Sequence, residues 1–462
     1  MKGVISRRVL CLILAVILLF GAYGCGRISQ TDHGYGASTI PQADSTDREA
    51  SEGTSEKTTA SDRENPSYGG ENLAADMMEG IVRNTVEGRV ADEKFIRAMA
   101  DFAVEIFRNY PSAEGEVSGD NVLISPLSSL LALAMTANGA AGETLSQMEA
   151  VLGGGMPISE LNRYLYTYTN SLPNTEKAKF KIANSIWFRD RFDVYPQFLQ
   201  ANADYYGAAV RKEPFDDGTK DAINAWVNEN TDGLIEYILS DSIPTDTMMY
   251  LINAIVFDAK WQHEYHLNDL REREFTAIDG TAKKVPMMWS EERKYLDDGK
   301  ATGFIKPYAN GYSFVALLPN EGVDIHEYIA SMTGDNLIKT LNQVENASVS
   351  VTLPKFSYED DTLMNAGLIK MGMPLAFGSL ADFTGMTPAG ENIYIDNVLQ
   401  KTFISVDELG TKAGAATMIE MTTESVPSYQ YTVTLNRPFV YMIIDNETKL
   451  PAFIGALLEM QE

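Results

Sequence analysis

The stretch VTLNRPFVYMI, residues 433–443, is the most informative part of the chain. An apolar run ends at Leu435, a polar pair follows, and Pro438-Phe439 opens a second apolar run. Short runs of apolar and β-branched residues on either side of a polar break are typical of buried strands. The stretch therefore predicts two buried strands near the C-terminus, a pattern that an ordinary buried hairpin would share.

Similar apolar runs lie on both sides of this stretch. They occur at residues 183–188, 250–257, 313–318, 348–353, 399–407, 429–435, 440–444 and 452–457. The early chain has a helical pattern instead, because apolar residues recur every three or four positions between Phe95 and Phe107, with Asp92 as the expected N-cap. Ser125-Pro126 predicts the start of a second, buried helix over 127–138. Helices early and strands late predict an α+β fold.

Composition excludes several classes of protein. The 462 residues carry 37 basic and 64 acidic side chains, and the net charge of −27 repels nucleic acid and anionic lipid. Cys11 and Cys25 are the only cysteines and there are four histidines, so we expect no disulfide and no metal site in the folded body. The sequence holds no nucleophile elbow, zinc-protease motif or phosphate loop. We therefore expect no enzyme and no cofactor.

The first residues are typical of an export signal. Basic residues precede the apolar run 9–20, which is too short to span a membrane comfortably. Gly24-Cys25 then resembles a bacterial lipobox, although Tyr23 departs from the usual pattern, and it makes Cys25 the predicted lipid attachment site. Residues 1–25 are predicted as the signal, the polar segment 26–88 as a flexible tether, and 89–462 as the folded domain. This predicts a location outside the cell or in the cell envelope.

Several separated segments, in order, resemble the serpin family. The C-terminal stretch 433–443 resembles the family signature, and the similarity covers roughly residues 90–460. The other segments are NVLISPLS (121–128), GAAGET (139–144), ANSIW (183–187), NAIVF (253–257) with Lys260-Trp261, LPKF (353–356) and ADFTG (381–385). The resemblance implies helices packed around three β-sheets with an exposed reactive-centre loop.

The resemblance also implies a function. Inhibitory serpins are monomers that trap serine proteases, and in some cases cysteine proteases: the protease cleaves the loop, stays bound as an acyl-enzyme, and is carried along as the loop inserts into the main sheet. Contact with a membrane would come only through the lipid on Cys25. We also expect no nucleic-acid partner.

The segment VDELGTKAGAAT, residues 406–417, resembles the hinge of an inhibitory serpin. Side chains alternate between the faces of a strand, so one parity of the loop must enter the core. That set is uncharged, and its first members are small. It consists of Thr411, Ala413, Ala415, Thr417, Ile419 and Met421. The hinge residues are Glu408, Gly410, Thr411, Ala413, Gly414, Ala415, Ala416 and Thr417.

Two further sites follow from the resemblance. The usual spacing from Glu408 predicts Glu424-Ser425 as the scissile bond, with cleavage after Thr423, Ser425 or Val426 as the alternatives. Four polar residues match the cluster with which serpins control opening of the main sheet, and here a glutamine replaces the usual histidine. This sheet-opening cluster is Ser125, Ser128, Asn253 and Gln400.

Two alternatives stay open at this stage. A non-inhibitory serpin, with a binding or chaperone role, would be cleaved in its loop without gaining stability. A solute-binding lipoprotein would share the anchor and tether, but it should show two alternating βαβ lobes, which this sequence lacks.

Overall fold

The computed structural model describes residues 75–461 except 111–119, 176–177, 389–392 and 412–427, and these residues belong to one compact unit. The helices are α1 (Glu93–Arg108), α2 (Pro126–Ala137), α3 (Gly142–Gly153), α4 (Ile158–Asn170), α5 (Pro196–Tyr206), α6 (Asp217–Asn230), α7 (Ile325–Ser331), α8 (Gly334–Asn342) and α9 (Asn365–Met371). Short 3-10 helices are η2 (Leu267–Asp269) and η3 (Pro374–Phe377). Within the described residues, no helix is long and apolar enough to cross a membrane.

The first two helices begin where the sequence predicts. Asp92 caps α1 by accepting a hydrogen bond from the backbone N–H of Phe95 at 3.0 Å. Ser125 caps α2 through its side chain, and Pro126 occupies the first turn, where it costs no hydrogen bond. Every residue of α2 is buried, which explains why its sequence has no polar face.

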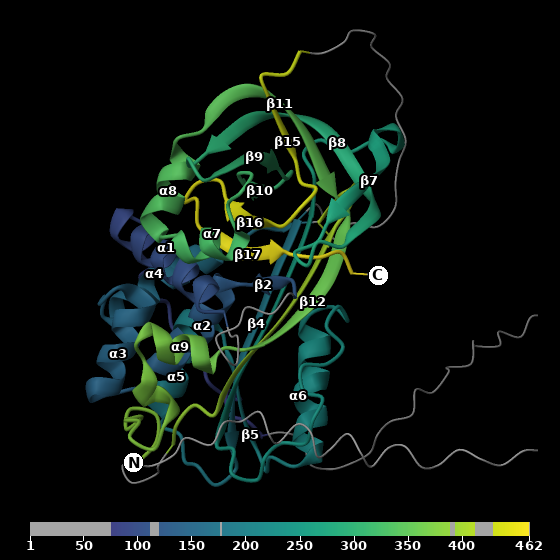
Figure 1. Ribbon diagram of the computed structural model, residues 1–462. Helices are drawn as coiled ribbons and strands as arrows, with labels where there is room; N and C mark the ends of the chain where they lie inside the picture. Colours follow the sequence, from purple (N-terminus) through teal and green to yellow (C-terminus); the bar gives the residue numbers. More distant parts are fainter. Residues whose placement is uncertain (1–74, 111–119, 176–177, 389–392, 412–427, 462) are drawn as a thin grey trace, which may run out of the picture. The chain divides into compact units, whose positions relative to one another are not determined.

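The functional part of the fold is centred on an eight-stranded sheet, which we call sheet A. Its order is β1-β5-β4-β6-β14-β13-β12, with β3 paired to β4. The strands are β1 (Ala75–Asp76), β3 (Asn174–Thr175), β4 (Ala178–Arg189), β5 (Ala209–Glu213), β6 (Met249–Lys260), β12 (Phe356–Leu363), β13 (Asn397–Val406) and β14 (Gly410–Thr411). In Figure 1 α2, α3, α5 and α9 lie on one side of this sheet and α6 on the other.

A second sheet has nine strands in the order β15-β11-β8-β9-β10-β16-β17-β2, with β7 paired to β8. They are β2 (Val122–Ile124), β7 (Leu270–Thr276), β8 (Ala282–Asp297), β9 (Ala301–Pro307), β10 (Tyr312–Pro319), β11 (Glu345–Pro354), β15 (Tyr431–Thr434), β16 (Phe439–Asp445) and β17 (Pro451–Leu457). The expected three sheets are two hydrogen-bonded sheets here, because β8 is long enough to pair with β7 and β11 along most of its length and with β9 at its end.

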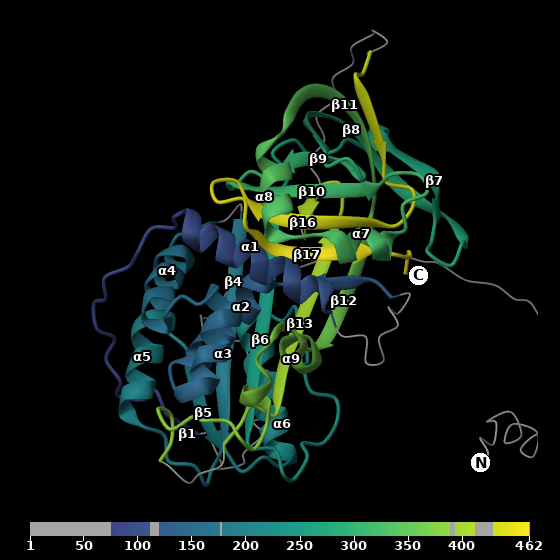
Figure 2. The same cartoon turned by 60° about the vertical axis from the view of Figure 1, so that its left-hand side comes forward.

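The stretch 433–443 does supply two strands, but they do not form a hairpin. β15 is an edge strand paired in parallel with β11, whereas β16 lies between β10 and β17 (Figure 2). The polar break therefore carries the chain from one end of the sheet to its interior.

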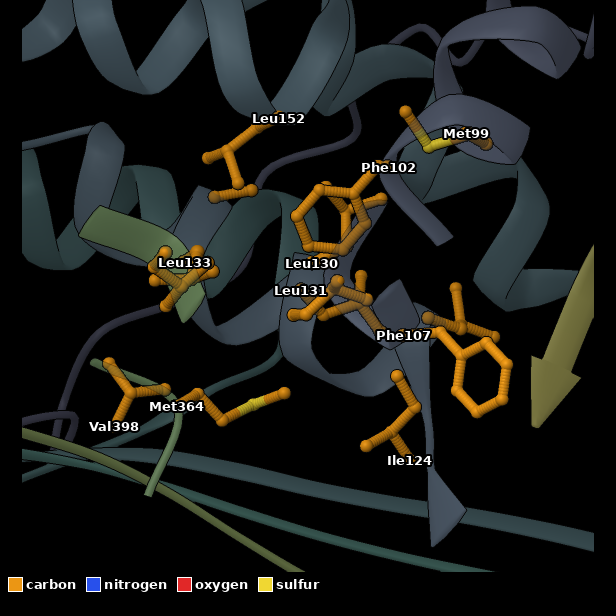
Figure 3. Close-up of a cluster of buried hydrophobic side chains, with 14 of the residues drawn as sticks. Met99, Phe102, Phe107, Ile124, Leu130, Leu131, Leu133, Leu152, Met364 and Val398 are labelled. Carbon is orange, nitrogen blue, oxygen red and sulfur yellow. The ribbon is translucent and has the colours of Figure 1, made fainter. Parts of the chain in front are cut away.

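The main core lies between α1, α2 and the two sheets. Figure 3 shows Phe102 of α1 next to Leu130 and Leu131 of α2, with Ile124 of β2 below them and Val398 of β13 further away beside Met364. A smaller apolar cluster on the opposite face of sheet A holds α6 against β4 and β6. The sheet is thus covered on both faces, and any strand added to it must fit between packed layers.

The folded body begins earlier than predicted. We expected the tether to run to residue 88, but β1 pairs with β5, and Met77, Met78 and Ile81 pack against the core. Three apolar residues in five positions are the signal that could have moved this boundary. Cys25, the export signal and the rest of the tether lie outside the described residues.

Candidate functional site

The centre of sheet A is a seam between two parallel strands that are distant in sequence. Residues Asn397–Thr402 of β13 pair directly with Tyr250–Ile255 of β6. A parallel pair of strands joined by a crossover can be separated without breaking a tight turn. We call this stretch the β6–β13 seam. It is closed in this structure.

At one end of the seam β14 enters between the two strands. Thr411 pairs with Ala259 of β6 and with Val406 of β13, and Gly410 pairs with Lys260. The side chain of Thr411 is 1% exposed, and its hydroxyl lies 2.5 Å from that of Tyr308. The first uncharged residue of the predicted inward parity is therefore already in the core.

Gly410 is required by its neighbour. A Cβ at this position would lie 2.1 Å from the carbonyl oxygen of Ala259, closer than real side chains approach a backbone. Any other residue would push β14 away from β6. The absence of a side chain at Gly410 therefore allows the hinge backbone to pair closely with β6.

An aromatic residue holds the backbone just before this entry. Trp261 donates its backbone N–H to the carbonyl of Leu409 at 2.9 Å and its indole N–H to that of Asp407 at 2.8 Å. Tyr265 donates its backbone N–H to the carbonyl of Glu408 at 2.9 Å. Three consecutive hinge carbonyls are thus tied to the segment that follows β6, and this fixes the point from which the loop departs.

Two acidic side chains at the hinge behave in opposite ways. Burial raises the pKa of Asp407, although its carboxylate accepts hydrogen bonds from the N–H groups of Leu409 and Gly410. Burial also acts to raise the pKa of Glu408, but the ion pair and hydrogen bond with Lys355 outweigh it and hold that pKa below its ordinary value. Lys355 is the residue that follows β11, so the pair joins the hinge to the second sheet.

The sheet-opening cluster forms midway along the seam. The side-chain nitrogen of Gln400 lies 2.9 Å from Oδ1 of Asn253, across the seam, and 3.0 Å from the carbonyl of Ser125. The side-chain oxygen of Gln400 accepts the backbone N–H of Ser125 at 2.8 Å. All these residues are 0–1% exposed, so each hydrogen bond replaces solvation that the group has lost.

The structure changes one member of this cluster. The hydroxyl of Ser128 is buried without a hydrogen-bond partner in the described structure, whereas Ser129 accepts from Gln400 at 2.7 Å. Ser128 and Ser129 both lie about one helical turn after the cap residue Ser125, so spacing in the sequence does not distinguish them. Asn184 of β4, which accepts from Asn253 at 2.6 Å, was also missed.

A buried cation lies behind the hinge anchor. The ammonium group of Lys306 is 2.8 Å from a carboxylate oxygen of Glu292 and 4.2 Å from the ring centre of Tyr265. Both charged side chains are less than 10% exposed. The sequence gives no sign that Lys306, which lies in the apolar strand β9, forms an ion pair with Glu292 of β8. The pair packs beneath the residues that hold the hinge.

The remaining predicted residues lie outside the described structure. They are Ala413, Gly414, Ala415, Ala416 and Thr417 of the hinge, Thr423, Glu424, Ser425 and Val426 around the reactive bond, and Cys25. Among the described residues no group of histidine, cysteine and acidic side chains could hold a metal ion.

A model of one protein family matches nearly the whole folded body. It is described as serpin, a serine protease inhibitor, and the match runs over residues 97–460. The chain belongs to the serpin family. Serpins are protease inhibitors rather than enzymes, and the fold described above matches a solved serpin structure.

Known relatives span the same region. The native state of tengpin, a thermophilic serpin, is 48% identical, covers 84% of this chain and 100% of its own, and superposes with a TM-score of 0.80. The latent state of tengpin, at 47% identity and 81% coverage of this chain, gives a TM-score of 0.71. The leukocyte elastase inhibitor of Sus scrofa is 29% identical over 380 residues, 79% of this serpin and 99% of its own length.

Proposed function

We propose that this serpin inhibits serine proteases by the trapping mechanism of its family. The observation that carries the proposal is the closed β6–β13 seam with β14 already seated at its end. A protease would cleave the loop near Glu424-Ser425 and remain attached as an acyl-enzyme. The freed segment would extend β14 through the seam as a new strand.

The arrangement of sheet A makes this insertion favourable. The pairing between β6 and β13 at residues 397–402 is lost, while the new strand gains a ladder on each side. A net gain of roughly a dozen hydrogen bonds at about 1 kcal/mol each is on the order of 10 kcal/mol, comparable with the stability of a whole domain. Burial of uncharged inward side chains adds to this gain.

The comparisons support the inhibitory reading. The match to native tengpin is better than the match to its latent state, in agreement with the closed seam of this serpin. One relative carries the name of an elastase inhibitor. Cleavage next to Thr423 or Val426, rather than after Glu424, would suit a protease of elastase-like specificity.

A protease panel tests the proposal. The serpin is incubated with chymotrypsin-, elastase-, subtilisin- and glutamate-specific proteases, and the products are separated in SDS. We expect a 1:1 complex that resists SDS with at least one protease, and mass spectrometry of the released C-terminal peptide identifies the bond. If every protease cleaves the loop and remains active, a non-inhibitory serpin with a binding role is the better description.

We further propose that the protein is exported and carries a lipid on Cys25. The apolar run 9–20 and Gly24-Cys25 support this proposal. Metabolic labelling with an alkyne-bearing fatty acid should mark the wild-type protein and spare Cys25→Ser. Cys11→Ser serves as the matched control, because it removes a cysteine from the apolar run without changing the lipobox. Equal labelling of wild type and Cys25→Ser would exclude the anchor.

A further inference from the structure

A gap in the edge of sheet A opens into a cavity. β3 pairs with β4 only at residues 178–179, and β5 pairs with it only from Ser185 onward, so the part of β4 between them has no strand partner on that side among the described residues. A cavity of about 490 Å³ lies at this gap. It is bounded by α2, α4 and α5, by β4 and the start of β5, and by the C-terminal end of α6.

The backbone of β4 offers a donor and an acceptor to this cavity. The N–H of Phe180 points away from β6, because it donates to the carbonyl of Pro173 at 3.1 Å. Backbone groups alternate in direction along a strand, so the N–H and C=O of Ile182 point the same way as those of Phe180. Ile182 therefore presents to the gap an amide edge that has no strand partner among the described residues.

Side chains around the cavity are amides and aromatic rings rather than charges. Asn170, Asn184 and Asn230 line it together with Phe180 and Trp226. The side-chain nitrogens of Asn170 and Asn230 donate to the carbonyls of Tyr166 and Trp226, and their side-chain oxygens accept no hydrogen bond from the described part of the chain.

Charge distinguishes the cavity from the rest of the surface. In a chain with 64 acidic residues, the lining contains no carboxylate and a single charged side chain, Arg83. Arg83 donates to the carbonyl of Asp204 at 3.3 Å and lies before the region matched by the family model. One wall of the cavity is therefore built by a segment outside that region.

We infer that this cavity is a binding site for a small uncharged ligand that carries hydroxyl and amide groups on a ring, of which N-acetylated sugars are the simplest class. An acetamido group would satisfy the N–H and C=O of Ile182 as a neighbouring strand would. Sugar hydroxyls would pair with the three asparagines, and the apolar face of the ring would pack on Trp226.

The site is also connected to the β6–β13 seam. Asn184 accepts from Asn253, and Asn253 in turn accepts from Gln400 across the seam, so three amides link the cavity to the sheet-opening cluster. A ligand that fixes Asn184 binds better to the closed sheet than to an expanded one. This coupling rests on the proposed function, because it requires the seam to open, whereas binding to the intact serpin does not.

Binding is tested with the full-length intact protein and two disaccharides. Di-N-acetylchitobiose and cellobiose share their ring skeleton, and only the first carries acetamido groups. We expect saturation-transfer NMR and calorimetry to show at least tenfold tighter binding of di-N-acetylchitobiose, with a change in tryptophan fluorescence that Trp226→Phe removes. Equal affinity for the two sugars, or binding of neither, would overturn the proposed ligand class.

A variant that fills the cavity tests whether the ligand binds there. Asn230→Trp fills the mouth of the cavity and should abolish binding, whereas Ala225→Trp, exposed on the same helix but away from the cavity, should not. Binding retained by Asn230→Trp, or lost equally in both variants while both melt as wild type, would contradict the site. The loop-cleaved serpin should bind at least fivefold more weakly than the intact protein. Equal affinity of the two forms would remove the coupling and leave the binding site itself in place.

Discussion

The side chain of Thr411 is the part of the hinge that lies in the core, so its size and polarity determine whether β14 can stay there. It is 1% exposed, and its hydroxyl meets Tyr308 at the end of the seam. Threonine suits this place because its methyl group fills apolar space and its hydroxyl has a partner. A charge there would have neither solvent nor a counterion, and an unpaired buried charge costs several kcal/mol.

We therefore expect Thr411→Arg to convert the inhibitor into a substrate. Arginine would displace β14 from its place between β6 and β13 in the intact protein, so insertion would lose its paired starting point and the acyl-enzyme would be hydrolysed before the protease is trapped. The stoichiometry of inhibition, measured by titrating a protease that forms a complex with the wild type, should rise at least tenfold. Thr411→Ser keeps the hydroxyl and should stay within about twofold. An unchanged stoichiometry for Thr411→Arg would show that the buried position of this side chain is not needed for insertion of the loop.

The ion pair between Glu408 and Lys355 makes the hinge sensitive to acid. The folded pKa of Glu408 lies below its ordinary value near 4.5, so its contribution to stability is present above that value and is lost as the pH falls through the lowered pKa. The difference in unfolding free energy between wild type and Glu408→Gln should therefore be constant from pH 7 to about pH 5 and shrink below it. Urea titrations at several pH values measure this difference.

Lys355→Met provides the control for that prediction. Without the ammonium group, burial is the largest remaining effect and it acts to raise the pKa of Glu408. In the Lys355→Met background the stability of the Glu408 protein relative to Glu408→Gln should therefore no longer fall on acidification. A relative stability that still falls below pH 5 in this background would contradict the assignment to the ion pair.

At the scale of elements, the register of β14 against β6 and β13 determines which residues the inserted loop would face. Thr411 is opposite Ala259 of β6 and Val406 of β13. If the strand continues in the same alignment, the hydroxyl of Thr417 comes opposite both Asn253 and Gln400. These two residues now pair with each other. Insertion would therefore replace their direct hydrogen bond by bonds to one threonine.

This alignment predicts a selective effect of Thr417→Val. Valine has the shape of threonine but cannot hydrogen-bond, so in the inserted form the buried amides of Asn253 and Gln400 would lose a partner, at about 1–3 kcal/mol each. The cleaved protein should become less stable toward guanidinium, whereas the intact protein should unfold as wild type does. Thr417→Ser should behave as wild type in both forms. Equal destabilisation of the intact and cleaved forms would refute the alignment.

The elements that the sequence predicted are those with a regular pattern. The strands within β4, β6, β10, β11, β13, β16 and β17 are confirmed, as are the starts of α1 and α2. β8 was missed because half of its residues are exposed, most of them charged, so no period of two stands out. In the sheet-opening cluster, Ser129 and Asn184 could not be chosen over Ser128, because only packing decides which hydroxyl and amide face Gln400.

For the whole molecule, the proposed insertion of the loop predicts that the intact form is not the most stable one. Cleavage usually loosens a protein because the new chain ends fray. Here the released segment can enter a sheet that is packed on both faces. We therefore expect the serpin nicked between Glu420 and Val426 to melt well above the intact protein in calorimetry. A lower or unchanged melting temperature would favour the non-inhibitory serpin and would direct attention to Gln400, which replaces the usual histidine of the family.

The seating of β14 has one further consequence, which concerns time rather than stability. Strands can pair in several alignments, and a slip of one residue would turn charged side chains such as Lys412 into the core. Because Gly410 and Thr411 are in place before any bond is cut, the released segment has no alignment to search for and can add residues one after another. Under the proposed mechanism, trapping succeeds only if insertion is faster than hydrolysis of the acyl-enzyme. The two residues of β14 that are already paired should therefore shorten the time that insertion takes.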